Sequence, residues 1–151
     1  MRADQLIKNY VMEEHVEHGI FVERHYTASG EVRPASGNIY YYVAPGERTQ
    51  FHRIDCDEYW CHNAGSKLEL WVIHHDGHLE KLYCGNDSNA EPCIRFAKGD
   101  IFAARLENDA DDGAFITCIT VPRFSYDGFE MFDKSEMIRN YPETKMFWAE
   151  D

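Results

Sequence analysis

A histidine and a glutamate six residues apart are the side chains in this sequence best suited to acid–base chemistry. His52 and Glu58 lie on two short strand-like segments bracketed by Gly46 and Gly65, both of which are typical of turns. An imidazole with a pKa near neutrality can remove a proton from a carbon beside a carbonyl group when a carboxylate orients it. We therefore predict that His52 acts as a general base and that Glu58 orients its ring.

Short β-strands must position these two side chains. Runs of aromatic and β-branched residues alternate with turn sequences along most of the chain, which is typical of a sandwich or barrel. The strongest hairpin is predicted between 68–73 and 79–83, because Asp76-Gly77 tolerates the positive φ angles of a tight turn. Apolar residues at helical spacing predict a short helix over 4–12 with Asp4 as its N-cap. The expected fold class is all-β with a short N-terminal helix.

Length and charge restrict the classes of function. A chain of 151 residues can bury one core, so we expect one domain over 1–133, including the leading helix. The tail, 134–151, is expected to pack on the barrel or on a partner subunit. The formal net charge of −12 argues against nucleic acid and anionic membranes as partners. No signal sequence and no apolar run of about 18 to 20 residues is visible, which predicts a cytoplasmic protein.

The spacing around His52 and Glu58 resembles the first motif of the cupin superfamily, in which two histidines and a glutamate face the interior of a jelly-roll β-barrel. Ile54 stands where that motif has its second histidine. Similarity to a small cupin branch of unassigned function extends over 6–133 and is carried by 39–43, 51–53, 57–60, 68–70 and 118–124. The resemblance implies a single-domain cupin jelly-roll β-barrel, a pocket for a small molecule and a homodimer.

The start of the chain also matches that branch. The family typically has a His-Pro-Glu-Gly-Gly-Tyr-Phe stretch, and the segment 15–21 here reads His-Val-Glu-His-Gly-Ile-Phe. His15, Glu17, Gly19 and Phe21 remain in register, whereas the proline, one glycine and the tyrosine are replaced. Glu23 follows Phe21 by two residues and either meets a ligand or faces water, as acidic side chains mostly do.

A metal centre is not expected at the His52 motif. Two-residue strand periodicity places Ile54 on the same face as His52, so an apolar side chain stands where metal-binding cupins have an imidazole. In the second cupin motif, Phe102 takes the place of the last histidine. His62 shares the inward face with Glu58 but lies roughly 13 Å from it along the strand. We therefore predict no cofactor, and a divalent metal at His52 and Glu58 is the alternative.

Three functions remain open. The preferred one is metal-independent isomerisation or epimerisation of a sugar-like or carbonyl compound. It follows from a resemblance to the metal-free sugar-nucleotide epimerases, which use a histidine base and a tyrosine acid; Tyr40 or Tyr42 would be the acid. The second is small-ligand binding or sensing without catalysis, in which the polar residues are hydrogen-bonded and buried and the aromatic residues form core. The third is a metal-dependent enzyme with an atypical ligand set.

The predicted ligand-binding residues are Phe21, Glu23, Tyr40, Tyr42, His52, Glu58, Trp60, His62 and Phe102, and the predicted catalytic residues are His52 and Glu58.

Two other patterns are weaker signs of a metal. Cys56-x4-Cys61-His62 lacks the short spacing and the second pair of a structural zinc site, so its cysteines are expected to be separate reduced thiols. The cluster His74-His75-x2-His78 lies at the predicted turn, where polar residues are expected, and such surface clusters bind nickel or zinc adventitiously. Glu69, between two leucines, is expected to face outward.

Overall fold

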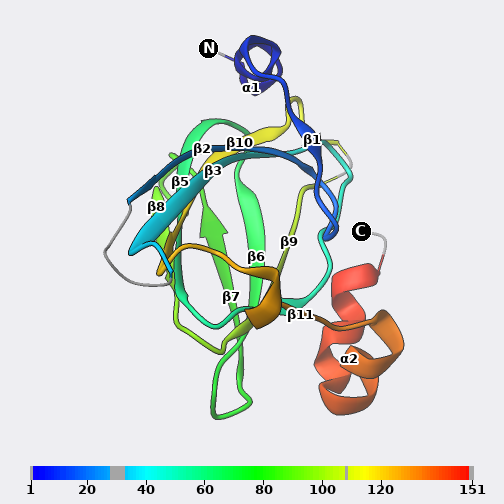
Figure 1. Cartoon of the computed structure of the whole chain (residues 1–151). Helices are drawn as coiled ribbons and strands as arrows, with labels where there is room; N and C mark the ends of the chain where they lie inside the picture. Colours follow the sequence, from blue (N-terminus) through cyan, green and yellow to red (C-terminus); the bar gives the residue numbers. More distant parts are fainter. Residues whose placement is uncertain (1, 28–32, 108, 150–151) are drawn as a thin grey trace.

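Two antiparallel β-sheets form the body of the computed structural model, which describes residues 2–27, 33–107 and 109–149 (Figure 1). The first sheet contains, in spatial order, β1 (Glu13–Glu14), β2 (Ile20–Thr27), β3 (Ser36–Val43), β10 (Ala114–Val121), β5 (Asp57–Gly65) and β8 (Cys93–Phe96). The second contains β11 (Glu130–Met131), β4 (His52–Arg53), β9 (Ile101–Arg105), β6 (Leu68–Ile73) and β7 (Leu79–Cys84). The prediction of a mostly β fold is confirmed.

The main core lies between the two sheets. Alternate residues of each strand point inward, so Tyr41 and Val43 of β3 are fully buried, as is Trp60 of β5. The indole of Trp60 packs against Phe96 and against Phe102 of the second sheet, with ring centroids 5.5 and 5.8 Å away. Each such side chain contributes about 1.5 to 3 kcal/mol through burial. The aromatic side chains of this core therefore hold the sheets together.

Closure into a barrel is not observed within the described residues. No ladder of paired strands joins the two sheets there, although one isolated bridge connects Cys84 with Glu91, just before β8. Sheets separated by large side chains lie about 10 Å apart, whereas hydrogen-bonded strands lie about 4.8 Å apart. The observed fold is two facing antiparallel sheets.

The predicted hairpin is confirmed, and the predicted leading helix is shorter than expected. Strands β6 and β7 pair from Leu68–Cys84 to Ile73–Leu79, with Gly77 at φ 87° in the turn. At the N-terminus, α1 (Ala3–Leu6) is followed by a 3-10 turn, η1 (Ile7–Asn9). Asp4 lies inside the helix, so its prediction as N-cap is wrong. The carboxylate of Asp112 replaces a cap, because it accepts the backbone N–H of Ala3 at 2.7 Å.

The C-terminal segment packs on the outer face of the second sheet. Helix α2 (Lys134–Asn140) begins at the N-cap Asp133, and the 3-10 helix η3 (Pro142–Trp148) follows it. Phe147 is fully buried against Phe51 and Trp71, with ring centroids 4.9 and 5.5 Å away. A shorter 3-10 turn, η2 (Tyr126–Gly128), precedes β11. The tail therefore forms a second hydrophobic layer with the outer face of the second sheet.

Glu69 shows one consequence of this second layer. Its side chain lies on the outer face of β6, as predicted, but only 8% of the residue is exposed. The carboxylate accepts the indole N–H of Trp71 and pairs with Arg105 at 3.0 Å, and that guanidinium also donates to the carbonyl of Phe147. Glu69 therefore faces outward, as expected, but it is buried because the tail covers this part of the sheet.

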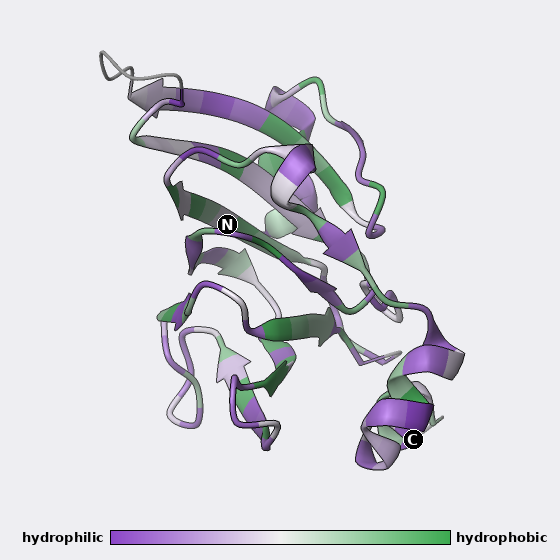
Figure 2. Cartoon of the chain, turned by 60° about the horizontal axis from the view of Figure 1, so that its bottom comes forward, coloured by the Kyte–Doolittle hydropathy of each residue, from purple (hydrophilic) through white to green (hydrophobic). Residues whose placement is uncertain are grey.

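The hydropathy of the residues differs between the strands and the C-terminal segment. In Figure 2, stretches of hydrophobic ribbon lie along the strands, and the C-terminal helical region carries both hydrophilic and hydrophobic residues. Within the described residues, no helix is long and apolar enough to span a membrane.

Candidate functional site

A cavity of about 270 Å³ lies between the sheets, beside the loop that follows β10. At its mouth are Tyr126, which is 56% exposed, and Glu23. At its buried end are Glu17, His52 and Glu58, each at most 8% exposed. The remaining lining residues are His15, Phe21, Gly37, Asn38, Ile39, Ile54, Cys118, Thr120, Arg123, Phe124, Ser125 and Phe129. The cavity therefore has an apolar wall and a small cluster of titratable groups at its buried end.

Glu17 reaches this cluster from a tight turn between β1 and β2. The backbone N–H of His15 donates to the carbonyl of Gly19 at 2.9 Å, and His18 takes a positive φ of 78°. The carbonyl of His18 is fixed by the hydroxyl of Tyr41, which donates to it at 2.5 Å. The backbone N–H of Gln50 donates to the carbonyl of Glu17 at 3.0 Å. These bonds hold the turn against the body and direct the Glu17 side chain inward.

The ring of His52 is held at one nitrogen. Its Nδ1 lies 2.9 Å from the carbonyl oxygen of Gln50 and 2.8 Å from Oε2 of Glu17. Both oxygens can only accept from the ring, so Nδ1 carries a proton and Nε2 is the nitrogen left for other partners. The Nδ1–H of His52 is directed at the carbonyl oxygen of Gln50. Oε2 of Glu17 therefore interacts with the ring through its charge, and it has no aligned hydrogen bond within the described residues. Nε2 of His52 likewise has no hydrogen-bond partner among them.

Charge within the cluster sets its protonation. Burial lowers the pKa of His52, but the carboxylate of Glu17, with a smaller effect of Glu58, raises that pKa to about 8. Burial favours protonation of Glu17, yet attraction to His52 leaves the Glu17 pKa below its ordinary value. At neutral pH the pair is therefore an imidazolium beside a carboxylate. Burial also lowers the pKa of His15, whose Nδ1 accepts the backbone N–H of Glu17 and so carries no proton.

Glu58 occupies the opposite side of the cluster, on β5. Burial raises its pKa to about 7, and the negative charge of Glu17 adds to this rise. The indole N–H of Trp60 donates to Glu58 Oε1 at 2.9 Å and fixes the carboxylate. Two groups that share the cavity, His52 and Glu58, therefore change protonation close to neutral pH.

Comparison with known proteins places this fold in a family. The family model described as Cupin superfamily (DUF985) matches residues 4–132. The chain belongs to this cupin family. Among curated proteins, none matches the chain.

Solved structures agree with the cupin fold. A protein of Shewanella oneidensis has 29% sequence identity and a TM-score of 0.87, over 97% of this chain and 94% of that chain. A hypothetical protein from Leishmania major has 24% identity and a TM-score of 0.87, over the full length of both chains. Oxalate decarboxylase from Bacillus subtilis has 13% identity and a TM-score of 0.62, over 96% of this chain and 38% of that chain. The last two show the fold alone.

Four of the predicted site residues of this cupin line the cavity. These are Phe21, Glu23, His52 and Glu58. Ile54 lines it as well, on the same side as His52, as strand periodicity predicted. The partner of His52 differs from the expectation, because Glu17 and not Glu58 contacts Nδ1.

The other predicted residues lie elsewhere. The ring of Tyr40 packs against Tyr10 and Phe115, away from the cavity, and Tyr42 shares its strand face. Trp60 and Phe102 are core residues, each 1% exposed. The ring of His62 instead contacts the carbonyl of Ser66 and the amide of Asn86, each at 3.0 Å. None of these five residues lines the cavity.

Sequence reasoning missed Glu17 and Arg123. Glu17 was in register with the family stretch at 15–21, and that match was the available signal for it. Arg123 forms a double hydrogen bond with Glu23 at the mouth, at 2.6 and 3.2 Å, in the loop after β10. It lies 100 residues from Glu23 in sequence, and a loop has no periodicity that could indicate its direction.

The donors in the cavity do not fit the metal centre of metal-binding cupins. Ile54 is apolar, and Phe102 packs on the His52 ring with centroids 4.3 Å apart. Nδ1 of His52 carries a proton and cannot ligate. Within the described residues, no three ligand atoms converge in the cavity, and the Cys56 and Cys61 thiols join no metal-ligand group. We therefore derive no chemical step through a metal at this site.

Proposed function

We propose that the cavity binds a small carbonyl compound and transfers protons on it without a metal, as an isomerase or epimerase does. The observation that carries the proposal is the fixed His52 ring, whose Nδ1 is held by Glu17 and the Gln50 carbonyl. This leaves Nε2 for a ligand. Glu58, the second titratable group of the cavity, supplies the other half of an acid–base pair.

The pKa values assign the roles differently from the sequence prediction. With a pKa of about 8, His52 is mainly an imidazolium at pH 7 and is suited to donate its Nε2 proton to a carbonyl oxygen. Glu58, with a pKa of about 7, is a carboxylate in a large fraction of molecules and accepts the proton of the adjacent carbon. The C–H electrons form the C=C bond of an enol, and the carbonyl π electrons take the proton from His52. In epimerisation, a proton returns to the opposite face of the same carbon, and the enol hydroxyl gives its proton back to His52. In isomerisation, Glu58 returns its proton to the former carbonyl carbon, and the hydroxyl on the neighbouring carbon loses its proton to His52 and becomes the new carbonyl.

The size and wall of the cavity restrict the substrate class. A volume of about 270 Å³ lies near the lower end for ligand pockets, which suits a compound of monosaccharide size better than a nucleotide sugar. Phe21, Ile39 and Phe129 give the pocket an apolar side, whereas Glu23 and Arg123 place charge at its mouth. We therefore infer a short hydroxy-aldehyde or hydroxy-ketone with one apolar edge.

Proton exchange tests this function directly. The protein is incubated in D₂O with a panel of small aldoses, ketoses and keto acids, and proton NMR follows loss of the signal at the carbon beside the carbonyl. Exchange that is lost in both His52→Ala and Glu58→Gln, with Glu136→Gln on the exposed helix as control, supports the proposal. Compounds that bind saturably but exchange no proton would contradict it.

Binding without turnover is the competing function. The indole of Trp60 and the Gln50 carbonyl already satisfy part of the hydrogen-bonding capacity of Glu58 and His52, as buried structural residues require. Saturable binding with unchanged exchange rates would establish this second function. The expected homodimer stays a prediction, which light scattering would test against the 17.6 kDa chain.

A further inference from the structure

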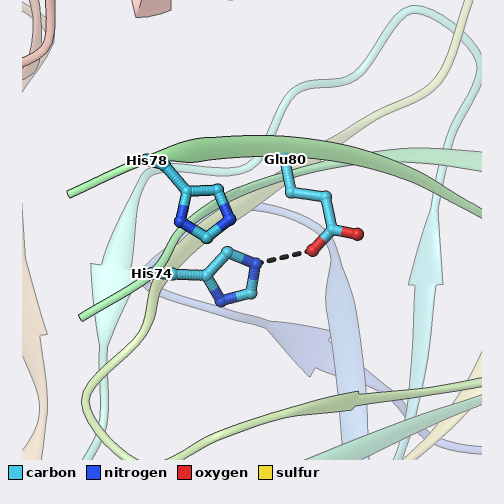
Figure 3. Close-up of side chains that lie close together, drawn as sticks. All are labelled: His74, His78 and Glu80. Carbon is cyan, nitrogen blue, oxygen red and sulfur yellow. Dashed lines mark hydrogen bonds and ion pairs between the residues drawn. The ribbon is translucent and has the colours of Figure 1, made fainter. Parts of the chain in front are cut away.

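The tip of the β6–β7 hairpin brings together two imidazoles and a carboxylate, none of which lines the cavity. His74 follows the end of β6, His78 precedes β7, and Glu80 lies on β7. One ligand atom from each lies within 4.8 Å of the other two. Figure 3 shows the two rings one above the other, with the Glu80 carboxylate turned toward His74. Their ring centroids are 4.5 Å apart, and Nε2 of His74 is 2.6 Å from Glu80 Oε2.

A second layer of carboxylates orients both rings. Oδ2 of Asp100 lies 3.4 Å from Nδ1 of His74, and Asp100 is itself buried and accepts the backbone N–H of Ala97 at 3.2 Å. Asp76 contacts Nδ1 of His78 and also accepts the backbone N–H of His78 at 3.1 Å. Metal-ligating histidines commonly carry such a carboxylate on the ring nitrogen that does not bind the metal. In both residues Nε2 is therefore the nitrogen left for a metal.

The ligand atoms of the cluster lie within 4.8 Å of one another, so small side-chain movements would bring them to the spacing that a zinc ion requires. Zn²⁺ bonds nitrogen and oxygen at about 2.0 to 2.1 Å, so two ligands of a tetrahedral ion lie about 3.3 Å apart. The Glu80 oxygen is closer than this to His74, so it would withdraw by about 0.7 Å to admit the ion. The Glu80 side chain is 45% exposed and has room to make this movement. Water would supply the fourth ligand.

We propose that His74, His78 and Glu80 form a binding site for Zn²⁺ or a similar divalent transition metal, with Asp76 and Asp100 as orienting residues. The ligand types suit this class of metal, since imidazole nitrogen with one carboxylate is a common zinc set. The surrounding carboxylates and the net charge of −12 attract cations. The bound ion connects both ends of the hairpin turn, and it stabilises the folded chain through mass action.

Calorimetric titration of the untagged full chain with ZnCl₂ tests the site. The wild type is expected to bind one ion with a saturable isotherm. His74→Ala and Glu80→Gln are each expected to weaken binding by at least 10-fold, and Asp76→Asn by about 10-fold through loss of ring orientation. His75→Ala is the matched control, because this exposed neighbour lies outside the cluster, and its affinity should stay within about twofold of the wild type.

A spectroscopic measurement complements the titration. Co²⁺ in place of zinc should give the intense visible absorption of a tetrahedral ion in the wild type and in His75→Ala, and not in His74→Ala. Circular dichroism establishes that each variant is folded, and the exposed position of Glu80 makes Glu80→Gln the safer variant in this respect. The proposal is overturned if the wild type shows no saturation below about 1 mM zinc, or if His75→Ala weakens binding as much as His74→Ala.

Discussion

Replacing Glu17 by Gln should lower the pKa of His52 and remove part of the pH dependence of stability. Glutamine keeps the shape of the side chain and an oxygen that can accept from Nδ1, but it removes the charge. Glu17 is the largest influence that raises the His52 pKa, and it opposes burial, which lowers that pKa. Without the charge, burial dominates, and we expect the pKa to fall from about 8 to below the ordinary 6.5.

The size of the effect follows from linkage. A rise from 6.5 to about 8 is 1.5 pKa units, or about 2 kcal/mol of stability. The folded state binds the His52 proton more tightly than the unfolded state, so this stability is fully present below pH 6.5 and is lost as pH rises through 8. Glu58, whose pKa rises from 4.5 to about 7, acts in the same direction at lower pH. Wild-type stability should therefore decline with rising pH, and Glu17→Gln should lose the decline between pH 6.5 and 8.

Two measurements check this prediction. Nitrogen-15 NMR of the imidazoles gives the His52 pKa, and urea unfolding at pH 6, 7 and 8 gives the free energy of unfolding. Glu23→Gln is the matched control, because this carboxylate also lines the cavity but pairs with Arg123 and does not contact His52. A His52 pKa that differs by less than about 0.3 units between wild type and Glu17→Gln would refute the reasoning.

Three further predictions concern packing and thiol reactivity. Gly19 has a φ of 75°, and the Cβ of Gly19→Ala would lie 2.6 Å from the ring of Tyr41, so this change should lower the free energy of unfolding in urea by about 2 to 4 kcal/mol. Gly77→Ala adds its Cβ in open space and should lower it by only about 1 kcal/mol. Phe147→Ala should lower the free energy of unfolding by about 3 to 5 kcal/mol, because this side chain is fully buried. Met146→Ala should lower it by less than about 0.5 kcal/mol, because Met146 is 60% exposed. Ellman's reagent should react quickly with exposed Cys93 and half-buried Cys61, whose sulfur atoms lie 3.0 Å apart. It should reach the buried thiols of Cys56, Cys84 and Cys118 only on unfolding, and more than two fast thiols in the native protein would contradict this packing.

Turn residues and two-residue periodicity in the sequence predicted the features that depend on residues close together in the chain. The Asp76-Gly77 pair indicated the β6–β7 hairpin because few residue types accept its positive φ angle. The shared face of His52 and Ile54 followed from two-residue periodicity, and both line the cavity. The same rule applied to 39–43 could have shown that Tyr40 faces away, since the apolar flanking residues Ile39 and Val43 alternate with it.

The remaining features of the site depend on contacts between distant residues. The β1–β2 turn brings Glu17 to His52 from 35 positions earlier, and residues in such a turn have no repeating pattern to indicate direction. His18 keeps the left-handed conformation of that turn although the family has glycine there, so the bonds of its neighbours must offset a conformational cost of about 1 to 3 kcal/mol. The turn is thus maintained against local preference. Such a conformation persists only where the surrounding structure fixes it, and here it holds in place the carboxylate that controls the protonation of His52.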